Sequence, residues 1–225
     1  FAKFRNVEKV SSFNLDSTIF SKKPGGTTVS GSLRICKLAS ISVFITGGIG
    51  GVHRDVSESM DVSSDLQAIK ESKIITVCAG PKTILDISKT YELLETLSIP
   101  AFSYRQNNLP AFWYRDTKLQ STHRVESPEA IAKIYSIARS INCCNGLLLC
   151  NPIPKKYSLD QMYLEPLILN GVKELKKANI TGKELTPSLL KYLVEKTNGK
   201  TLLSNIELIK NNALLGAKVA KALDY

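Results

Sequence analysis

The stretch that decides the fold runs from Ile45 to Asp86 and has the sequence ITGGIGGVHRDVSESMDVSSDLQAIKESKIITVCAGPKTILD. Apolar residues at 41–46 and 74–78 predict two strands, and neither run alternates with polar residues. Uninterrupted apolar runs are typical of strands covered on both faces inside a parallel sheet. Because ligands bind where parallel strands end, the polar residues that follow these two runs predict an active site.

The rest of the chain alternates predicted strands with predicted helices, which indicates a layered α/β/α sandwich with a mostly parallel central sheet and a helical C-terminal part. We expect an irregular lead over 1–26 and a capping box of Ser204 and Glu207 at the last helix. The further predicted strands are 99–104 and 146–150, and the predicted helices are 27–38, 128–142, 159–178, 187–197 and 205–222. No repeat or low-complexity linker interrupts the chain, so we predict a single domain over 1–225.

Lys82 is the first candidate catalytic residue. It follows Ala79-Gly80-Pro81, and the apolar spacing after it predicts a helix that begins at this lysine. The positive end of a helix dipole disfavours an ammonium group, so we expect a lowered pKa and a larger neutral fraction. A neutral lysine amine can act as a Schiff-base nucleophile. The alternative is a solvated surface lysine.

The segment Asp61-Val62-Ser63-Ser64-Asp65 has two interpretations that do not exclude each other. It predicts a helix start, with Ser64 as the N-cap and Asp65 in the favourable first turn. A carboxylate beside hydroxyl groups and free amides also suits a hard divalent cation that keeps several waters.

The glycine loop at 47–51 is not a nucleotide fingerprint. The third glycine of the dinucleotide pattern is replaced by His53, and no Gly-Lys-Ser/Thr follows. We interpret these glycines as positions where a ligand approaches the backbone closely. Two further segments stay open: the start of the helix near Thr28 suits a phosphate or a plain cap, and the aromatic loop at 112–114 suits base stacking or core packing.

Composition limits the choice of partners. Thirty Lys and Arg against twenty Asp and Glu give a net charge of +10, but the cations are dispersed among acids. A solvated basic surface, or a positive field that gathers a phosphorylated substrate, therefore fits better than nucleic-acid binding. The apolar runs stay short of the roughly 18 residues of a membrane span. The cysteines form no C-x-x-C pair, which argues against zinc and favours a reducing, cytoplasmic compartment; they are Cys36, Cys78, Cys143, Cys144 and Cys150.

Several motifs together resemble the pseudouridine-5′-phosphate glycosidase family. The most specific are TGGIGGVHR, DVSSD and CAGPKTILD in the stretch from Ile45 to Asp86. The resemblance extends through EKVS (8–11), GGTTV (25–29), NPIP (151–154), GKELTP (182–187) and SNIELIKNNA (204–213). One departure is Pro81, where the family pattern has alanine; proline should stiffen the turn and keep the chemistry.

The resemblance implies an enzyme that interconverts pseudouridine 5′-phosphate plus water with uracil plus ribose 5-phosphate. It implies that Lys82 is the nucleophile and that Asp61 binds manganese. The residues it implies for substrate binding are Lys9, Thr28, Val29, His53, Ser63, Ser64, Asp65 and Asn205. It also implies a homotrimer, and in some relatives a fused sugar kinase domain.

The general-acid glutamate of the family belongs to a segment upstream of the equivalent of Lys9, and no glutamate of this chain matches it by motif. We therefore expect a fragment or one portion of a longer polypeptide. Two other classes stay open: an aldolase-like enzyme that uses Lys82 as a Schiff base on another phosphosugar, and a non-catalytic domain of a larger protein.

Overall fold

The computed structural model describes residues 7–121, 123–180 and 182–223. In this part of the chain, a five-stranded sheet has the order β3-β4-β7-β5-β6, and every neighbouring pair is parallel. The strands are β3 (Val43–Ile45), β4 (Ile75–Cys78), β5 (Ala101–Tyr104), β6 (His123–Val125) and β7 (Leu147–Cys150). The sheet confirms the predicted α/β class. The edge strand β6 was not predicted, because its residues are mostly polar and exposed.

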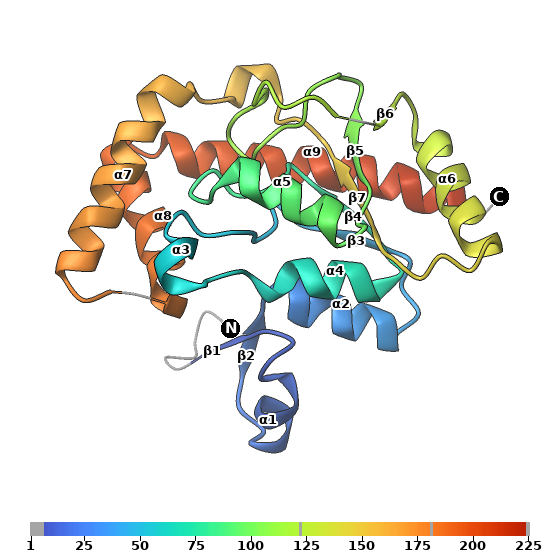
Figure 1. Ribbon diagram of the computed structural model, residues 1–225, viewed down its shortest axis with the longest axis horizontal. Helices are drawn as coiled ribbons and strands as arrows, with labels where there is room; N and C mark the ends of the chain where they lie inside the picture. Colours follow the sequence, from blue (N-terminus) through green and yellow to red (C-terminus); the bar gives the residue numbers. More distant parts are fainter. Residues whose placement is uncertain (1–6, 122, 181, 224–225) are drawn as a thin grey trace.

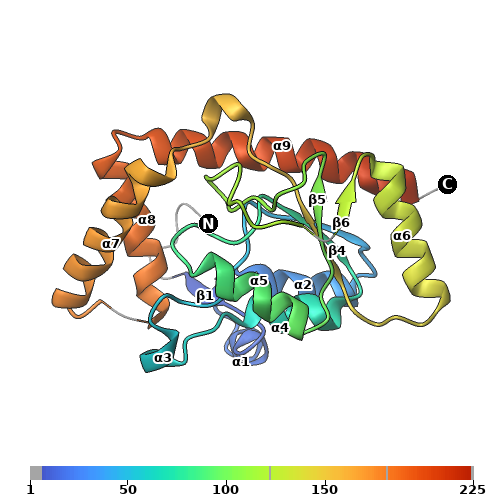
Figure 2. The same cartoon turned by 45° about the horizontal axis from the view of Figure 1, so that its top comes forward.

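Helices cover both faces of the sheet (Figures 1 and 2). Side chains of α2 (Val29–Leu38), α4 (Ser64–Ser72) and α5 (Ile87–Thr96) share one core with Cys78 and Cys150. Side chains of α6 (Pro128–Ser140) and α9 (Lys200–Leu223) share another core with the alternate residues of the same strands. Every residue of β4 and β7 is buried, which explains why their sequences do not alternate.

The C-terminal part is helical as predicted, but two of its helices start earlier. It comprises the short 3-10 turns η1 (Lys155–Tyr157) and η2 (Gly182–Glu184), α7 (Gln161–Lys177), α8 (Leu185–Lys196) and α9. The predicted capping box is wrong: α9 begins at Lys200, so Ser204 lies inside the helix and its hydroxyl donates to the carbonyl of Tyr157 at 2.8 Å. The Ser204 hydroxyl thus makes a tertiary hydrogen bond and does not cap the helix.

The predicted irregular lead is also wrong. Beyond residues 1–6, which lie outside the described residues, the chain forms β1 (Glu8–Val10), α1 (Leu15–Phe20) and β2 (Gly25–Thr27). The two strands pair in parallel, and the arm they form with α1 projects from the body of the molecule (Figure 1). Glu8 ties the arm together by accepting from the Thr18 hydroxyl at 3.1 Å and the Lys23 ammonium at 3.2 Å. Such contacts between short polar segments leave no periodic signal in the sequence.

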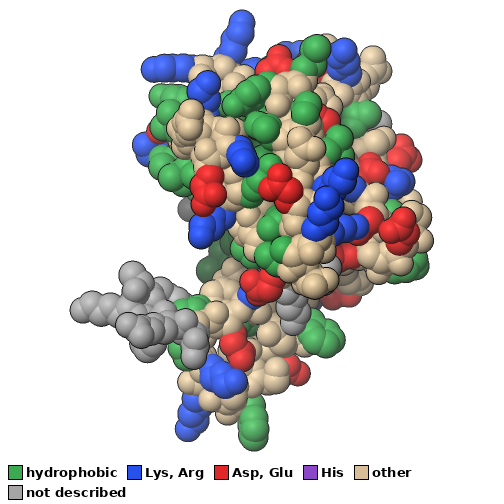
Figure 3. Space-filling view, turned by 90° about the vertical axis from the view of Figure 1, so that its left-hand side faces the viewer, with side chains coloured by type: hydrophobic (Ala, Val, Ile, Leu, Met, Phe, Trp, Pro, Cys, Tyr) green, Lys and Arg blue, Asp and Glu red, His purple; other side chains and the backbone are tan. Residues whose placement is uncertain are grey.

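Charged residues are spread over the surface. On the face made by α7 and α8, lysines and arginines lie among acidic residues without forming a continuous basic track (Figure 3). None of the helices described here combines the length and the apolarity that a membrane crossing requires.

Candidate active site

The segments that follow β3 and β4 form one wall of a cleft of about 1010 Å³. The base of the N-terminal arm, the start of α2, the start of α4 and residues of α7 and α8 complete it. Nine of the ten predicted site residues line this cleft, namely Lys9, Thr28, Val29, His53, Asp61, Ser63, Ser64, Asp65 and Lys82. Residues up to 73 positions apart in the sequence (82 − 9) are thus brought to one site.

The backbone around Lys82 differs from the prediction. The helix α5 begins only at Ile87, and the Asp86 side chain caps it by accepting from the Lys89 amide at 3.1 Å. Lys82 lies in an irregular turn, where its amide donates to the Ile49 carbonyl at 3.1 Å. The helix-dipole explanation for a lowered pKa is therefore wrong, because Lys82 is not in a helical turn.

The pKa of Lys82 is nevertheless lowered, and burial is the main cause. Removing an ammonium group from water penalises its charged form. The positive charge of Lys9 adds to the effect, whereas the carboxylate of Asp65 opposes it. The direction of the predicted shift is confirmed, with desolvation as its origin.

Asp65 organises the backbone of the cleft. It is 4% exposed, and its two oxygens accept from the amides of Ser30 at 2.9 Å and Gly50 at 2.8 Å. These bonds join the start of α2 to the glycine loop, and a charged acceptor makes both of them strong. The predicted contact between Asp65 and a substrate stays a prediction.

The start of α4 corrects the predicted cap. Ser63, not Ser64, is the N-cap, and its hydroxyl accepts from the Asp65 amide at 3.2 Å. Ser64 instead bonds the hydroxyl of Ser30 at 3.0 Å. Thr28 caps α2 in the same way, so two helix starts meet at the cleft. Exposed amides at helix starts favour anions.

His53 and Asp61 lie side by side although the short helix α3 (Val56–Ser59) separates them in sequence. The His53 amide donates to the Asp61 carbonyl at 3.1 Å, and the imidazole Nε2 is 3.7 Å from an Asp61 carboxylate oxygen. Within the described chain, no three His, Cys, Asp or Glu side chains converge as metal ligands. The half-exposed carboxylate of Asp61 opens into the cleft, which fits a hard cation that keeps most of its waters.

The glycine loop serves internal packing. A Cβ on Gly50 would lie 2.2 Å from the Ser63 hydroxyl oxygen, and a Cβ on Gly48 would lie 2.6 Å from the ring of Phe112. A Cβ on Gly51 would lie 2.4 Å from the side chain of Thr90. Although Gly50 lines the cleft, the crowding at these positions comes from the protein itself. These contacts do not support the prediction that the glycines let a ligand approach the backbone closely.

Asn205 is the predicted site residue that the structure does not bring to the cleft lining. Its side-chain oxygen accepts from the indole of Trp113 at 2.6 Å. The aromatic loop at 112–114 is buried in the core between the sheet and the C-terminal helices. Of the two alternatives for this loop, the structure therefore supports core packing. The role of Asn205 near a base stays a prediction.

No sequence pattern identifies Lys176, which lines the cleft from α7. Its ammonium binds the Asp55 carboxylate at 2.7 Å and thereby lowers the pKa of Asp55. In the sequence Lys176 belongs to a basic run at 173–177 that resembles any solvated helix face. Only the docking of α7 beside α3 reveals it.

The structure thus combines a parallel α/β sandwich with a cleft that is lined by hydroxyl groups and holds a desolvated lysine, as expected of an enzyme active site. The family model described as Indigoidine synthase A like protein matches residues 1–222, and the chain belongs to that family.

Relatives with similar sequences carry one name. The pseudouridine-5′-phosphate glycosidase of Staphylococcus aureus (strain MW2) is 42% identical over 98% of this chain and 72% of its own length. That of Petrotoga mobilis is 43% identical over 96% of this chain and 71% of its own length.

Solved structures agree with the fold. The prealnumycin C-glycosynthase AlnA, crystallised with ribulose 5-phosphate, matches with a TM-score of 0.92 at 29% identity, over 99% of this chain and 73% of that one. An indigoidine synthase A-like protein from Thermotoga maritima matches with a TM-score of 0.90 at 35% identity, over 98% and 72%.

Proposed function

We propose that this chain carries the activity of a pseudouridine-5′-phosphate glycosidase, which splits pseudouridine 5′-phosphate with water into uracil and ribose 5-phosphate. The observation that carries the proposal is Lys82, whose pKa is lowered by burial in a cleft lined with hydroxyl groups and cations. The names and identities of the relatives support the choice of substrate.

The proposed chemistry replaces one difficult bond cleavage by two easier steps. The neutral amine of Lys82 forms a bond to C1′ while the bond from C1′ to the ring oxygen breaks and that oxygen takes a proton. The nitrogen lone pair then forms a C=N bond as the electron pair of the C1′–uracil bond passes to the uracil carbon, which is protonated. Water hydrolyses the imine, which releases ribose 5-phosphate and restores the amine.

A carboxylate pair like that of ordinary glycosidases is not needed for this route. Two acids that line the cleft already have other contacts: Asp65 holds two backbone amides, and Asp61 lies beside His53. Two carboxyl groups flanking the bond would be required for the oxocarbenium mechanism. The occupied oxygens of Asp65 therefore favour the amine as nucleophile.

The 5′-phosphate is proposed to bind among Lys9, Thr28, His53 and Ser63. Thr28 and Ser63 cap α2 and α4, so the positive ends of both helix dipoles lie at the same region of the cleft. Lysine and hydroxyl donors add charge-assisted hydrogen bonds. Unphosphorylated pseudouridine is therefore expected to be a much poorer substrate.

Asp61 is proposed to hold a divalent cation, manganese by resemblance. Its exposed carboxylate supplies one hard oxygen ligand, with His53 beside it. When bound, such an ion supplies positive charge that orients the substrate and offsets negative charge. Titration of the chain with Mn²⁺, followed by electron paramagnetic resonance, should show binding that Asp61→Asn removes. Unchanged binding in that variant would contradict the assignment.

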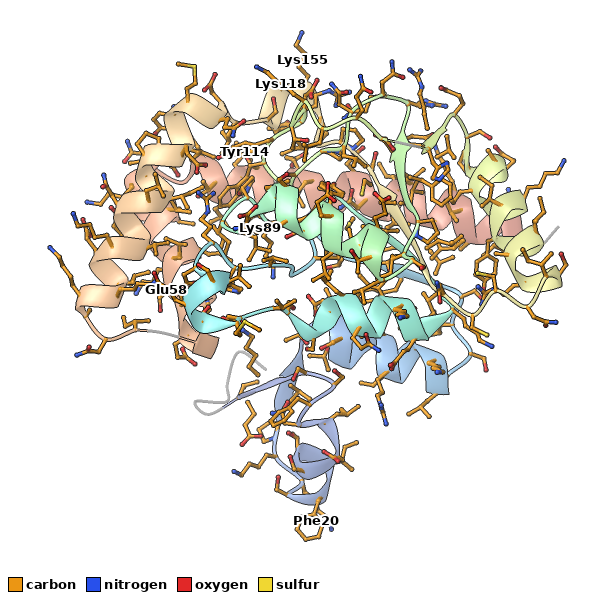
Figure 4. All side chains as sticks on the ribbon, in the orientation of Figure 1. Phe20, Glu58, Lys89, Tyr114, Lys118 and Lys155 are labelled. Carbon is orange, nitrogen blue, oxygen red and sulfur yellow. The ribbon has the colours of Figure 1, made fainter. Side chains whose placement is uncertain are left out.

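A homotrimer is proposed for the assembly. The N-terminal arm and α2 leave Phe13, Phe20 and Leu38 more than four-fifths exposed, at 81%, 89% and 81%. Phe20 lies at the tip of the arm, away from the body (Figure 4). Large exposed apolar side chains often mark contacts between proteins. Light scattering coupled to size-exclusion chromatography tests this, and a monomer at micromolar concentration would contradict it.

A second candidate is the formation of a carbon–carbon bond between a pentose phosphate and another aromatic carbon. The favouring observation is the fold match to a C-glycosynthase crystallised with ribulose 5-phosphate. The same imine on Lys82 would accept either carbon nucleophile, the carbon of uracil or that of another aromatic ring.

Uracil release distinguishes the two activities. The chain is incubated with pseudouridine 5′-phosphate and with pseudouridine, and free uracil is measured by chromatography. We expect uracil from the nucleotide only, and none with Lys82→Ala. Equal release from both substrates would contradict the phosphate assignment, and no release from either would contradict the glycosidase activity of this chain.

A further inference from the structure

The turn that carries Lys82 lacks part of its own backbone hydrogen bonding. No backbone amide of the described residues donates to the carbonyl of Thr83 or Ile84. Both carbonyls accept instead from the guanidinium of Arg54, at 2.8 Å from Nη2 to Thr83 and 3.0 Å from Nε to Ile84. One side chain therefore holds the two residues that follow the lysine.

The same guanidinium is anchored on its other side. It forms an ion pair with Glu165 of α7, in which Nη2 lies 3.2 Å from the second carboxylate oxygen. The hydroxyl of Tyr114, a buried residue beside α7 labelled in Figure 4, lies 3.5 Å from that oxygen. Arg54 also follows His53 directly in the chain. Three segments that are distant in sequence thus meet at one planar group.

Arg54 does not line the cleft that holds Lys82. It lines two smaller hollows: one adjoins the cleft at His53 and includes Ile84, and the other includes Leu85 and Glu165. Lys82 and His53 therefore face the cleft, whereas the guanidinium of Arg54 contacts the backbone of the lysine turn.

We propose that Arg54 is a positioning residue, which fixes the turn after Lys82 so that the lysine amine meets C1′ of the pentose phosphate in reacting geometry. The proposal rests on the proposed function, because it assigns Arg54 to the imine-forming step. Reacting atoms must approach to about 3–3.5 Å in line, and a displacement near 1 Å can cost about 100-fold in rate. The docking of α7 through Glu165 completes this support.

Arginine suits the task better than lysine. Its five N–H donors lie in one plane, so it can serve two adjacent carbonyls and a carboxylate at the same time. A lysine has a single ammonium at the end of a flexible chain. Arg54→Lys keeps the charge but loses the shared plane, which separates the geometric role from a purely electrostatic one.

The test measures how fast the chain forms a borohydride-trapped adduct with ribose 5-phosphate. We expect Arg54→Ala and Arg54→Lys to lower the maximal trapping rate at least about 10-fold while the half-saturating concentration and the pH midpoint stay unchanged. Glu165→Gln should lower the rate less, because the carbonyl bonds remain. Arg124→Ala is the matched control, since Arg124 also pairs with a nearby glutamate but lies exposed on β6.

Chemical rescue separates positioning from folding. Ethylguanidinium at millimolar concentration should restore trapping in Arg54→Ala by filling the vacated site, and it should not restore Lys82→Ala. An Arg54→Ala rate equal to wild type, a loss explained by a shifted pH midpoint, or a loss without rescue would overturn the proposal.

Failure of the proposed function gives a different result. A wild-type chain that forms no adduct on Lys82 would contradict the activity, and hydrogen exchange would then decide on Arg54. Arg54→Ala should accelerate exchange of the amides at Leu85 and Asp86, which donate within and next to the turn, relative to Arg124→Ala. Unchanged exchange there would overturn the positioning role.

Discussion

Replacing Asp65 by asparagine should change both stability and chemistry, in directions that the structure determines. The carboxylate accepts from the amides of Ser30 and Gly50 at 2.9 and 2.8 Å and is 4% exposed. Asparagine keeps one oxygen for one amide, and its own NH₂ group then faces the other. A hydrogen bond to a charged group contributes about 1.5–3 kcal/mol, and an unpaired buried donor costs about 1–3 kcal/mol.

These terms predict that Asp65→Asn lowers the free energy of unfolding by about 2–5 kcal/mol. A domain of this size loses about 2–4 °C in Tm for each kcal/mol, so a decrease of roughly 4–20 °C should appear in thermal unfolding. Asp61→Asn is the matched control, because the Asp61 carboxylate is 40% exposed and accepts from no backbone amide of the described residues. Its Tm should stay within about 2 °C of wild type.

The same variant should shift the chemistry toward acid. The Asp65 carboxylate raises the pKa of Lys82 against the effect of burial, so its removal lowers that pKa further. The pH midpoint of borohydride trapping with ribose 5-phosphate should therefore move to lower pH, even though an acid has been removed from the cleft. An unchanged Tm would refute the structural role of Asp65, and an alkaline shift would refute its electrostatic effect on Lys82.

Three further predictions can be tested by urea unfolding. Thr83→Val should leave the free energy of unfolding unchanged or raise it by about 1 kcal/mol, because the buried Thr83 hydroxyl has no hydrogen-bond partner among the described residues. Thr90→Val should lower the free energy of unfolding, because the Thr90 hydroxyl bonds two backbone groups. Equal losses in the two variants would contradict this. The free energy of unfolding of the wild type should rise with pH between the lowered pKa of folded Lys82 and the usual 10.5, because in this range only the unfolded chain keeps the proton. Lys82→Met should lack this rise. If the free energies of unfolding of the two proteins change with pH in parallel, burial is refuted as the cause of the lowered pKa. Gly50→Ala should lower the free energy of unfolding by about 1–3 kcal/mol through overpacking. Gly26→Ala should lower it little, because a Cβ at Gly26 meets nothing closer than 3.8 Å. Similar losses in the two variants would contradict the crowding at Gly50.

Buried strands and strong helix starts could be predicted from the sequence. The apolar run that becomes β7 and the Ser127-Pro128-Glu129 start of α6 carry local signals, and the Ser127 hydroxyl caps the helix as expected, at 3.2 Å from the Ala130 amide. The start of α5 was misplaced because the proline before Lys82 resembles a first helical turn. The bond from the Lys82 amide to Ile49, far away in sequence, shapes that turn instead.

The cleft residues could be predicted mainly from motifs, because hydrophobic spacing alone does not identify them. Motif matching placed Lys9 with Lys82, and the structure brings both to one cleft. Motif matching could not find Lys176, and it could not find the role of Arg54. Their positions depend on how α7 docks against the loop after β3, and such tertiary contacts leave no periodic signal in the chain.

The central claim is that Lys82 forms an imine with C1′ of ribose 5-phosphate, and peptide mapping tests it most directly. The chain is incubated with ribose 5-phosphate, reduced with borohydride and digested, and the modified peptide is identified by mass spectrometry. We predict one reduced pentose phosphate on Lys82 and none in Lys82→Ala. A stable adduct on another lysine, or full uracil release by Lys82→Ala, would contradict the mechanism.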